Sequence, residues 1–522
     1  MLEIKQLKEL AGSVMIKHQP MMSLYQTLAD NFYPERADFT VTRNIGIELA
    51  DLLVESYPVL VRRDLGDSLA AMLRDGEWFS VGINGEADQQ GAMWLQWASK
   101  RLMELITARS SNFVRATKEG DHDFITFGDC VISVELNKKA DGLLYRCWHL
   151  RDCSWWDDES GQVGGVVRKW KPTYGDMVEY FGKDNVHGDV AKAEGKDKMK
   201  EGDVRHIVMT SEMYGDETIE NPYVSIFIDV KNDKLLEVTG INNKFYVVPR
   251  FKTIPGSQFA YSPATVVGLP DARSMQEMQH TLLEAAERYS NPPILATQKV
   301  IRSDVDLSAG GITWVDDEYD ERLGASLRPI AQDRGGYPIG MDMHDRIADT
   351  LKSAFYMSKM TLPETNKEMT AYEVSERMKQ YRRENLPLFQ PIEDEYNGQL
   401  CELSFDVAMS AGFLGSPQDI PQSLLGQDIV FKFESPLSAS EEEKKVNQFG
   451  QVIEMANNAA TIDPNAASNV DVDAALRDAM SGSGAPESWK RLPEDVTNIR
   501  KIDAETKQAM TEAEMGQMEG QA

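Results

Sequence analysis

The hydrophobic pattern of this chain changes its period along the sequence, and these changes constrain the fold more than any other feature. Up to about Arg115, apolar residues recur three and four positions apart, the spacing of one helix face, in LADLLVESY at 49–57, DSLAAMLRD at 67–75 and GAMWLQWASKRLMELITARS at 91–110. From Phe124 to about Phe251, short segments rich in β-branched and aromatic residues indicate strands. Helical spacing then returns. Helices and strands in separate stretches of one chain are typical of the α+β class.

Two details refine these regions. In the helical part, six large apolar residues share one stripe, and residues of these types are mostly buried, so we expect a core stripe made of Met93, Trp94, Trp97, Leu102, Leu105 and Ile106. In the β-rich part, Asp157 to Gly161 has turn-forming residues between two strand-like arms, which predicts a hairpin. Residues 182–202, rich in Lys, Asp and Gly, predict an exposed loop.

A further helix is predicted before the sequence Asn291-Pro292-Pro293. Ser274 and Glu277 have the spacing of a capping box at its start, and the prolines end it because they cannot donate helical hydrogen bonds. Glu284 is placed to pair with Arg288 one turn later. Its apolar stripe, at steps of three and four, consists of Met275, Met278, Leu282, Ala286 and Tyr289.

The remaining sequence predicts more helices. One runs from Met341 to about Ser358, and the loop 359–369 follows it. A long helix begins with a capping-box spacing at Thr370, is kinked by Pro387 and Pro391, and continues to about Gly412. Ser440 and Glu443 repeat the spacing, and helices are expected before the breaker at 482–486, with a frayed end over the last dozen residues.

The charge and cysteine content limit the function classes. A chain of 522 residues is long enough for several domains, and its net charge of −29 argues against a broad nucleic-acid-gripping surface. That acidity has two open explanations, solubility alone or a surface that DNA must pass without sticking. The four Cys lack disulfide-framework or zinc spacing, which favours a reducing cytoplasm. Residues 253–270 are uncharged but contain three prolines, so no membrane span is expected.

Common catalytic motifs are missing from the sequence. It contains no P-loop, no H-E-x-x-H and no G-x-S-x-G. Asp121-His122-Asp123 could hold a metal, but three polar residues before a strand are more typical of an exposed turn. The acidic run 157–159 could mimic a two-metal nuclease, yet a hairpin turn explains it better. We therefore expect no enzyme, no catalytic residue, no cofactor and no metal.

Four stretches, in this order, resemble the head-to-tail connecting proteins, or portal proteins, of short-tailed bacteriophages. They are FITFGDCVISVE at 124–135, WWDDESGQVGGVVRKW at 155–170, LPDARSMQEMQHTLLEAAERYSNPPI at 269–294 and EMTAYEVSERMKQ at 368–380. The resemblance implies the portal fold: a wing at 1–262, helical at first and β-rich from about 124, a two-helix stem at 263–290 and 341–358, and a β-containing clip at 291–340. It also implies a tunnel loop at 359–369, a long kinked helix returning to the wing at 370–439, and a helical crown at 440–522.

The resemblance also implies partners. Family members form a ring of twelve at one capsid vertex of the virion, assembled in the host cytoplasm, and double-stranded DNA passes without sequence reading during packaging and ejection. The clip, with Pro292, Pro293 and Trp314, would dock the terminase large subunit and later tail adaptor or nozzle proteins. Major capsid and scaffolding proteins would be further partners, and no membrane is involved.

Some functional questions stay open in the sequence. Lys359 and Lys367 on the tunnel loop either touch the DNA backbone or are merely solvated. The alternatives to a portal are a phage metal-dependent nuclease and another structural virion protein, of the shell or an internal core.

Overall fold

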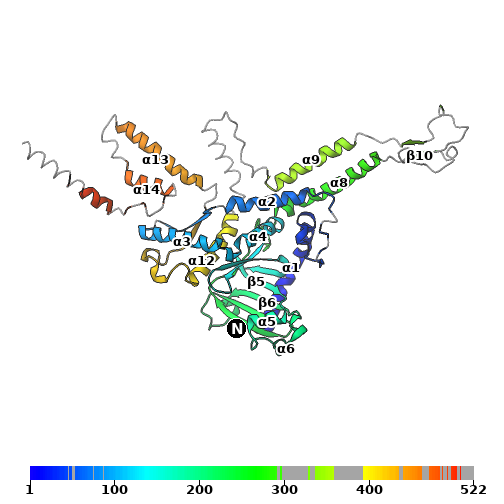
Figure 1. The fold of residues 1–522 in the computed structure, drawn as a ribbon, viewed down its shortest axis with the longest axis horizontal. Coiled ribbons are helices and arrows are strands. Elements are labelled where there is room, and N and C mark those ends of the chain that lie inside the picture. The colour runs from blue at the N-terminus through cyan, green and yellow to red at the C-terminus, as the bar shows by residue number, and fades with distance from the viewer. Residues whose placement is uncertain are drawn as a thin grey trace, which may run out of the picture.

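The structure is a computed structural model. It describes residues 1–290, apart from 45, 47, 50–52, 75 and 86, together with 294–296, 322, 327–329, 336–357, 392–433, 439–460, 470–482 and short pieces between 485 and 506. A body of helices and sheets carries a two-helix arm on one side and a helical hairpin on the other (Figure 1). Helices dominate up to residue 127 and strands dominate from 131 to 247, and this mixture of helix and sheet is consistent with the α+β class.

The N-terminal part of the body is helical. It contains α1 (Ile4–Phe32), α2 (Tyr57–Leu73), α3 (Gln89–Thr107) and α4 (Phe113–Phe127), and the single short strand β1 (Phe79–Ile83). The prediction of a helix over 49–57 is wrong for the described residues, because α2 begins only at Tyr57. Glu55 there accepts a hydrogen bond from the Tyr57 backbone N–H, which helps to fix this start.

The β-rich region starts later than predicted. Residues 124–127 belong to α4, which ends at Gly128 in the left-handed conformation (φ 94°), and β2 (Val131–Leu136) follows. Strand β2 pairs with β3 (Leu143–Trp148) and β9 (Tyr246–Val247) in one antiparallel sheet. The predicted hairpin is confirmed, since β4 (Cys153–Asp157) and β5 (Val163–Trp170) pair antiparallel across residues 158–162.

A five-stranded antiparallel sheet continues this hairpin. Its order is β4-β5-β6-β7-β8, with β6 (Val204–Thr210), β7 (Tyr223–Asp229) and β8 (Lys234–Ile241). One face packs on the first half of α1, where Leu7, Ala11 and Val14 are buried. The other face is covered by α5 (Tyr174–Phe181) and α6 (Gly188–Ala191), so both faces of the sheet are buried.

The predicted loop 182–202 is partly wrong. It includes α6 and the short helix η4 (Gly195–Met199), and its residues Val186 and Val190 are buried. Both apolar residues dock on the sheet together with Phe181, because a short amphipathic segment gains stability by burying its apolar side.

The helical stripe on α3 is only partly a core stripe. Leu102, Leu105 and Ile106 are buried and Trp94 packs against the core, but Met93 and Trp97 are 47% and 46% exposed. Met93 and Trp97 lie on the side of α3 opposite to Leu102, so the prediction that they are buried is wrong.

The arm consists of α8 (Leu269–Ser290) and α9 (Gly336–Ala354), with the short antiparallel strands β10 (Ile294–Ala296) and β11 (Leu327–Pro329) beyond it (Figure 1). Helix α8 continues from a π-helical turn, η5 (Ala264–Gly268), so Ser274 lies inside the helix and does not cap it. The end at Ser290 and the Glu284–Arg288 ion pair agree with the sequence prediction. Helix α9 begins five residues before the predicted Met341 and ends at Ala354.

The chain returns to the body after residue 391. A π-helical segment, η7 (Ile392–Gly398), leads into α12 (Gln399–Ser410), and β12 (Ile429–Phe433) pairs with β1. The expected helical continuation to about Gly412 is thus confirmed, while Thr370, Glu373, Pro387 and Pro391 lie outside the described residues.

Two helices, α13 (Ala439–Ala460) and α14 (Val472–Gly482), precede the breaker at 482–486, as predicted. Helix α13 already includes Ala439, so Ser440 is a helical residue and not the cap. The last dozen residues lie outside the described part of the chain. Among the described helices, none combines the length and apolar character that crossing a bilayer requires.

Candidate functional site

The arm is held together by small and apolar residues between α8 and α9. On α8, Met275 is fully buried and Leu282 is 8% exposed, and on α9 Leu351 is fully buried. A Cβ at Gly340 would lie only 2.8 Å from Cδ2 of Leu282, so the glycine lets the two helices approach closely near their outer ends. The arm therefore has apolar contacts both at its base, where Met275 and Leu351 join the core of the body, and near its outer end.

The base of the arm is fixed to the body by aromatic packing. A Cβ at Gly268, on the π-helical turn η5, would lie 3.0 Å from the Phe355 ring and 3.1 Å from the Phe32 ring. These two rings are 5.5 Å apart between centroids and are both fully buried. The close approach fixes the direction in which the arm leaves α1.

Hydrogen bonds add to this anchorage. Gln276 on α8 accepts from the backbone N–H groups of Val54 (2.9 Å) and Glu55 (3.0 Å), and its amide donates to the Glu55 carbonyl (2.6 Å). Tyr57, the first residue of α2, donates to the Ala348 carbonyl of α9 at 3.4 Å. The segment before α2 thus holds both arm helices.

A buried carboxyl ties the chain entering the arm to α4. Asp129 accepts a hydrogen bond from the Tyr25 hydroxyl (3.0 Å) and from the backbone N–H of Ala260 (3.3 Å). The Gly128 carbonyl accepts from the backbone N–H of Phe251 at 2.8 Å. Complete burial raises the pKa of Asp129 to about 8 in spite of the two hydrogen bonds it accepts.

Helix α4 carries buried charges, and this corrects the prediction of an exposed turn at Asp121-His122-Asp123. Asp121 pairs with Arg74 at 2.8 Å and Asp123 with Arg36 at 2.7 Å, and both carboxylate side chains are 1% exposed. The three residues continue the helical spacing of Phe113 to Phe127, and the arginines that neutralise them come from distant segments.

His122 completes this set. Its Nδ1 lies 3.1 Å from Nη1 of Arg62 on α2, and the imidazole is largely buried. Burial and the Arg62 guanidinium lower the pKa of His122, so the ring is neutral near pH 7 and accepts the hydrogen bond. These interactions attach α2 and the 34–36 turn to α4.

The π-helical segment η7 contacts Arg74, the residue that pairs with Asp121 on α4. Asn397 accepts from Nε of Arg74 at 2.9 Å, and the Arg74 guanidinium lies 4.6 Å from the centre of the Tyr396 ring. Glu395 accepts from the backbone N–H of Arg250 at 3.1 Å. Three consecutive residues of η7 therefore fix the point where the chain re-enters the body.

The acidic run at 157–159 lies at the hairpin turn, as the sequence indicated, with Asp157 ending β4 and Asp158 and Glu159 beginning the turn. Asp158 accepts hydrogen bonds from the backbone N–H groups of Ser160 (2.8 Å) and Gln162 (3.0 Å), and Asp157 pairs with Arg250 at 3.3 Å. Within the described residues, no group of three or more His, Cys, Asp or Glu converges on a point where a metal ion would fit.

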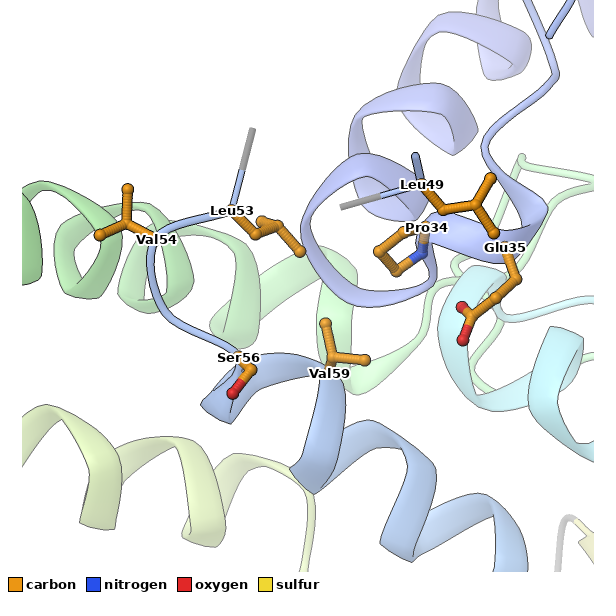
Figure 2. A pocket seen from close by; sticks show the side chains of 7 residues that line it. All are labelled: Pro34, Glu35, Leu49, Leu53, Val54, Ser56 and Val59. Carbon is orange, nitrogen blue, oxygen red and sulfur yellow. The ribbon is translucent and has the colours of Figure 1, made fainter. Parts of the chain in front are cut away.

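One open cavity of about 280 Å³ lies where the end of α1 meets the start of α2 (Figure 2). Figure 2 shows side chains from the turn that follows α1, from the segment before α2 and from the first turn of α2 facing this space. Its lining has few polar groups to orient a ligand. The lining residues are Pro34, Glu35, Leu49, Leu53, Val54, Ser56 and Val59.

The residues singled out from the sequence lie in different places. Met275 and Leu282 are buried in the arm, Met278 and Ala286 are half-buried, and Tyr289 precedes Ser290, the last residue of α8. Lys359 and Lys367 of the expected tunnel loop lie outside the described residues, as do Pro292, Pro293 and Trp314 of the expected clip.

Several anchoring residues were not predicted at all. Arg74, Asp129 and Tyr396 each lie in a stretch without a recognisable motif. The hydrogen-bond partners of Arg74, for example, lie 47 and 323 positions away in the chain. The one local signal was the apolar spacing of Phe113, Phe124 and Phe127, which places Asp121 and Asp123 on a helix.

Comparison with known proteins now decides the family. The sequence profile described as "Bacteriophage head to tail connecting protein" matches residues 4–489. This chain belongs to the bacteriophage head-to-tail connecting protein family. The match covers the body, both arm helices and the C-terminal hairpin in a single stretch.

Two curated portal proteins are similar over most of their length. The probable portal protein of Bordetella phage BPP-1 is 23% identical over 484 residues, which cover 88% of this chain and 84% of that protein. The portal protein of Salmonella phage epsilon15 is 22% identical over 449 residues, covering 82% and 77%. The resemblance seen in the sequence is confirmed, and this connecting protein has a portal role between phage head and tail.

Proposed function

We propose that identical copies of this connecting protein close into a ring, with twelve copies in the virion, whose pore passes double-stranded DNA during packaging and ejection. The observation that carries the proposal is the family match, which runs through residues 4–489 without a break. The ring is a structural conduit, and the reaction chemistry of packaging belongs to its partners.

The parts of the chain have separate roles in this ring. Residues 1–262 are the wing, 263–290 and 341–358 the stem, 291–340 the clip, 359–369 the tunnel loop, 370–439 the long helix with its return, and 440–522 the crown. The arm of α8 and α9 supports the stem assignment, because it stands away from the body with both helices anchored at one end (Figure 1). Met275 and Leu282 are the packing residues of this stem.

The partners follow from the same assignment. The clip, with Pro292, Pro293 and Trp314, docks the terminase large subunit and later tail adaptor or nozzle proteins. Major capsid and scaffolding proteins surround the ring at one vertex, and assembly takes place in the host cytoplasm. A chain with a net charge of −29 repels DNA at long range, which favours passage over sticking.

Electron microscopy of the purified full-length protein tests the ring. We expect particles with a central hole and a rotational symmetry that class averages resolve. Light scattering over a range of concentrations gives the mass independently. A chain that stays monomeric at every concentration, also beside its procapsid partners, would rule the proposal out.

The tunnel-loop assignment gives a second test. Replacing Lys359 and Lys367 together with Ala should leave ring formation intact and lower the amount of retained DNA by about twofold or more, since each Lys–phosphate contact adds to salt-dependent affinity. Retained DNA is measured in packaged particles at two salt concentrations. The matched control replaces Lys192 and Lys196, which lie by α6 and η4 at the far end of the wing. Equal retention in both double variants would reject the DNA contact.

A further inference from the structure

Helix α3 presents an apolar and basic surface that nothing in a single copy covers. Met93 and Trp97, four residues apart, are 47% and 46% exposed, while Leu95 and Leu102 on the other side are buried. Lys100 and Arg101 follow one turn later on the same side, with Arg101 paired to Glu104 at 3.2 Å. We call Met93, Trp97, Lys100 and Arg101 the α3 surface.

This surface is a basic island in an acidic protein. Between Gln96 and Lys118 the sequence has five basic residues and one acidic residue, although the whole chain carries −29. A monomer that keeps a half-exposed tryptophan beside clustered cations is typical of a surface that another polypeptide covers. The partner should be apolar in its centre and acidic overall.

The C-terminal hairpin, residues 439–482, has these properties. Helices α13 and α14 pack on each other, but Ala479 is the single buried residue among those whose burial the structure describes in them. Val472 and Leu476, on the same side of α14 as Ala479, remain 45% and 43% exposed. Two helices packed only on each other cannot close an apolar core, so a third layer is needed.

The charge of the hairpin is complementary to the α3 surface. Residues 439–482 contain eight acidic and three basic residues. Apolar residues of the hairpin would meet Met93 and Trp97, and its acidic residues would face Lys100 and Arg101. This arrangement buries the apolar residues that the hairpin and the α3 surface each leave exposed in a single copy.

The hairpin and helix α3 lie at the same end of the molecule (Figure 1). The exposure of Trp97 and Leu476 persists with the hairpin of the same chain present, so that hairpin covers neither residue. The chain also limits its reach, because the six steps from the end of β12 to the start of α13 span at most about 20–22 Å. In a ring, the nearest other α3 surface belongs to the adjacent copy.

We propose that the C-terminal hairpin of one copy packs on the α3 surface of the next copy, with Val472 and Leu476 against Met93 and Trp97. This inference rests on the proposed ring. Because the two surfaces are different, the contact is heterologous, and repeating it around an axis closes a ring when the rotation per copy is right.

Disulfide cross-linking in assembled full-length rings tests the contact. The variant combines Trp97→Cys with Leu476→Cys on a Cys147→Ser background, since the other three native cysteines are buried. Mild oxidation should give a ladder of covalent oligomers on a denaturing gel. Each single variant should stay monomeric on that gel, and rings assembled from a mixture of the two single variants should give covalent dimers and no ladder.

The matched control pairs Leu476→Cys with Met213→Cys. Met213 is 42% exposed on α7 (Ser211–Tyr214), beside the five-stranded sheet, and this pair should give no ladder. Adding Lys100→Glu and Arg101→Glu to the first pair should lower its cross-linking rate by about fivefold or more at low salt.

The outcomes separate the contact from the ring. Rings that form normally but give no ladder would overturn the contact while leaving the proposed function intact. A cross-link confined to single chains would show that the hairpin folds onto its own α3 surface, and covalent dimers from Leu476→Cys alone would show hairpins pairing with each other. Either result overturns the proposal. Absence of rings by microscopy would instead count against the proposed function.

Discussion

Replacing Arg74 with Ala should lower the free energy of unfolding by about 3–5 kcal/mol, the usual cost of breaking a buried ion pair from one side. The Arg74 guanidinium is 5% exposed and lies 2.8 Å from the Asp121 carboxylate, whose side chain is 1% exposed. Burial lowers the pKa of Arg74 and raises that of Asp121, and in each case the charge of the partner opposes the effect of burial, so the two charges stabilise each other. The variant leaves the buried Asp121 carboxyl without its cation and Asn397 without its donor inside the body.

Chemical denaturation followed by tryptophan fluorescence measures this loss. The control is Arg115→Ala, which removes an equivalent Arg from a pair with Glu119 at 2.9 Å on the surface of α4. Arg115 is 76% exposed, and such i,i+4 pairs contribute about 0.3–0.5 kcal/mol. Equal losses in the two variants would contradict the role given to Arg74.

A double variant distinguishes two contributions to the stability loss of Arg74→Ala: the lost attraction between Arg74 and Asp121, and the cost of a buried Asp121 carboxyl without a partner. Arg74→Met with Asp121→Leu replaces the ion pair by apolar groups of similar size, which is often nearly neutral. We therefore expect the double variant to be more stable than Arg74→Ala, although it removes more polar groups. If the double variant is as stable as the unmodified protein, the ion pair adds no stability to the body, and its role is to position η7 through the hydrogen bond from Arg74 to Asn397.

The sequence predicted those parts of the fold that depend on local spacing. Helix α3, the hairpin across 158–162 and both arm helices were found because periodicity, turn residues and a Pro-Pro stop act within a few residues. The start of α8 predicted from the capping-box spacing at Ser274 was wrong. The π-helical turn at 264–268 runs directly into α8, so the chain is already helical before Ser274. A favourable local motif does not act where the chain is already helical.

The parts that could not be predicted depend on distant partners. Strand β1 forms because Phe79 pairs with Phe433, some 350 positions later, and no local signal in either segment identifies this partner. Asp121 and Asp123 look like surface residues until Arg74 and Arg36 are brought beside them. Only tertiary packing makes a buried charge acceptable, so polar spacing by itself pointed to a turn.

The portal role came from the order of several weak stretches, and the family match over 4–489 supports that order. The DNA-facing and partner-docking residues remain proposals, because Lys359, Lys367 and Trp314 lie outside the described residues. What the structure adds is the anchorage of the arm, which passes through Gln276, Phe355 and Asp129 and had no signature in the sequence.

Replacing Asp129 with Asn should make the protein more stable at pH 8.5 and have little effect at pH 5. Burial raises the pKa of Asp129 to about 8 in the folded state, against about 3.9 in an unfolded chain. The unfolded state therefore binds fewer protons between these values, and stability falls as pH rises from about 4 to about 8. Ionised Asp129 costs up to about 5 kcal/mol above pH 8, and a neutral amide avoids this cost.

The surroundings of Asp129 set the size of this effect. The Tyr25 hydroxyl, the Ala260 N–H and Arg250 favour the carboxylate, while Glu395 and burial oppose it. Thermal unfolding midpoints of both proteins from pH 5 to pH 9 give the two profiles. The control is Asp158→Asn. Hydrogen bonds from Ser160 and Gln162 lower the pKa of Asp158, so this variant should not gain stability at high pH.

Parallel profiles for Asp129→Asn and the unmodified protein would mean that Asp129 is ionised throughout. The entry of the chain into the arm would then rest on a charged carboxylate held by Tyr25 and Ala260, and no part of its stability would change with pH.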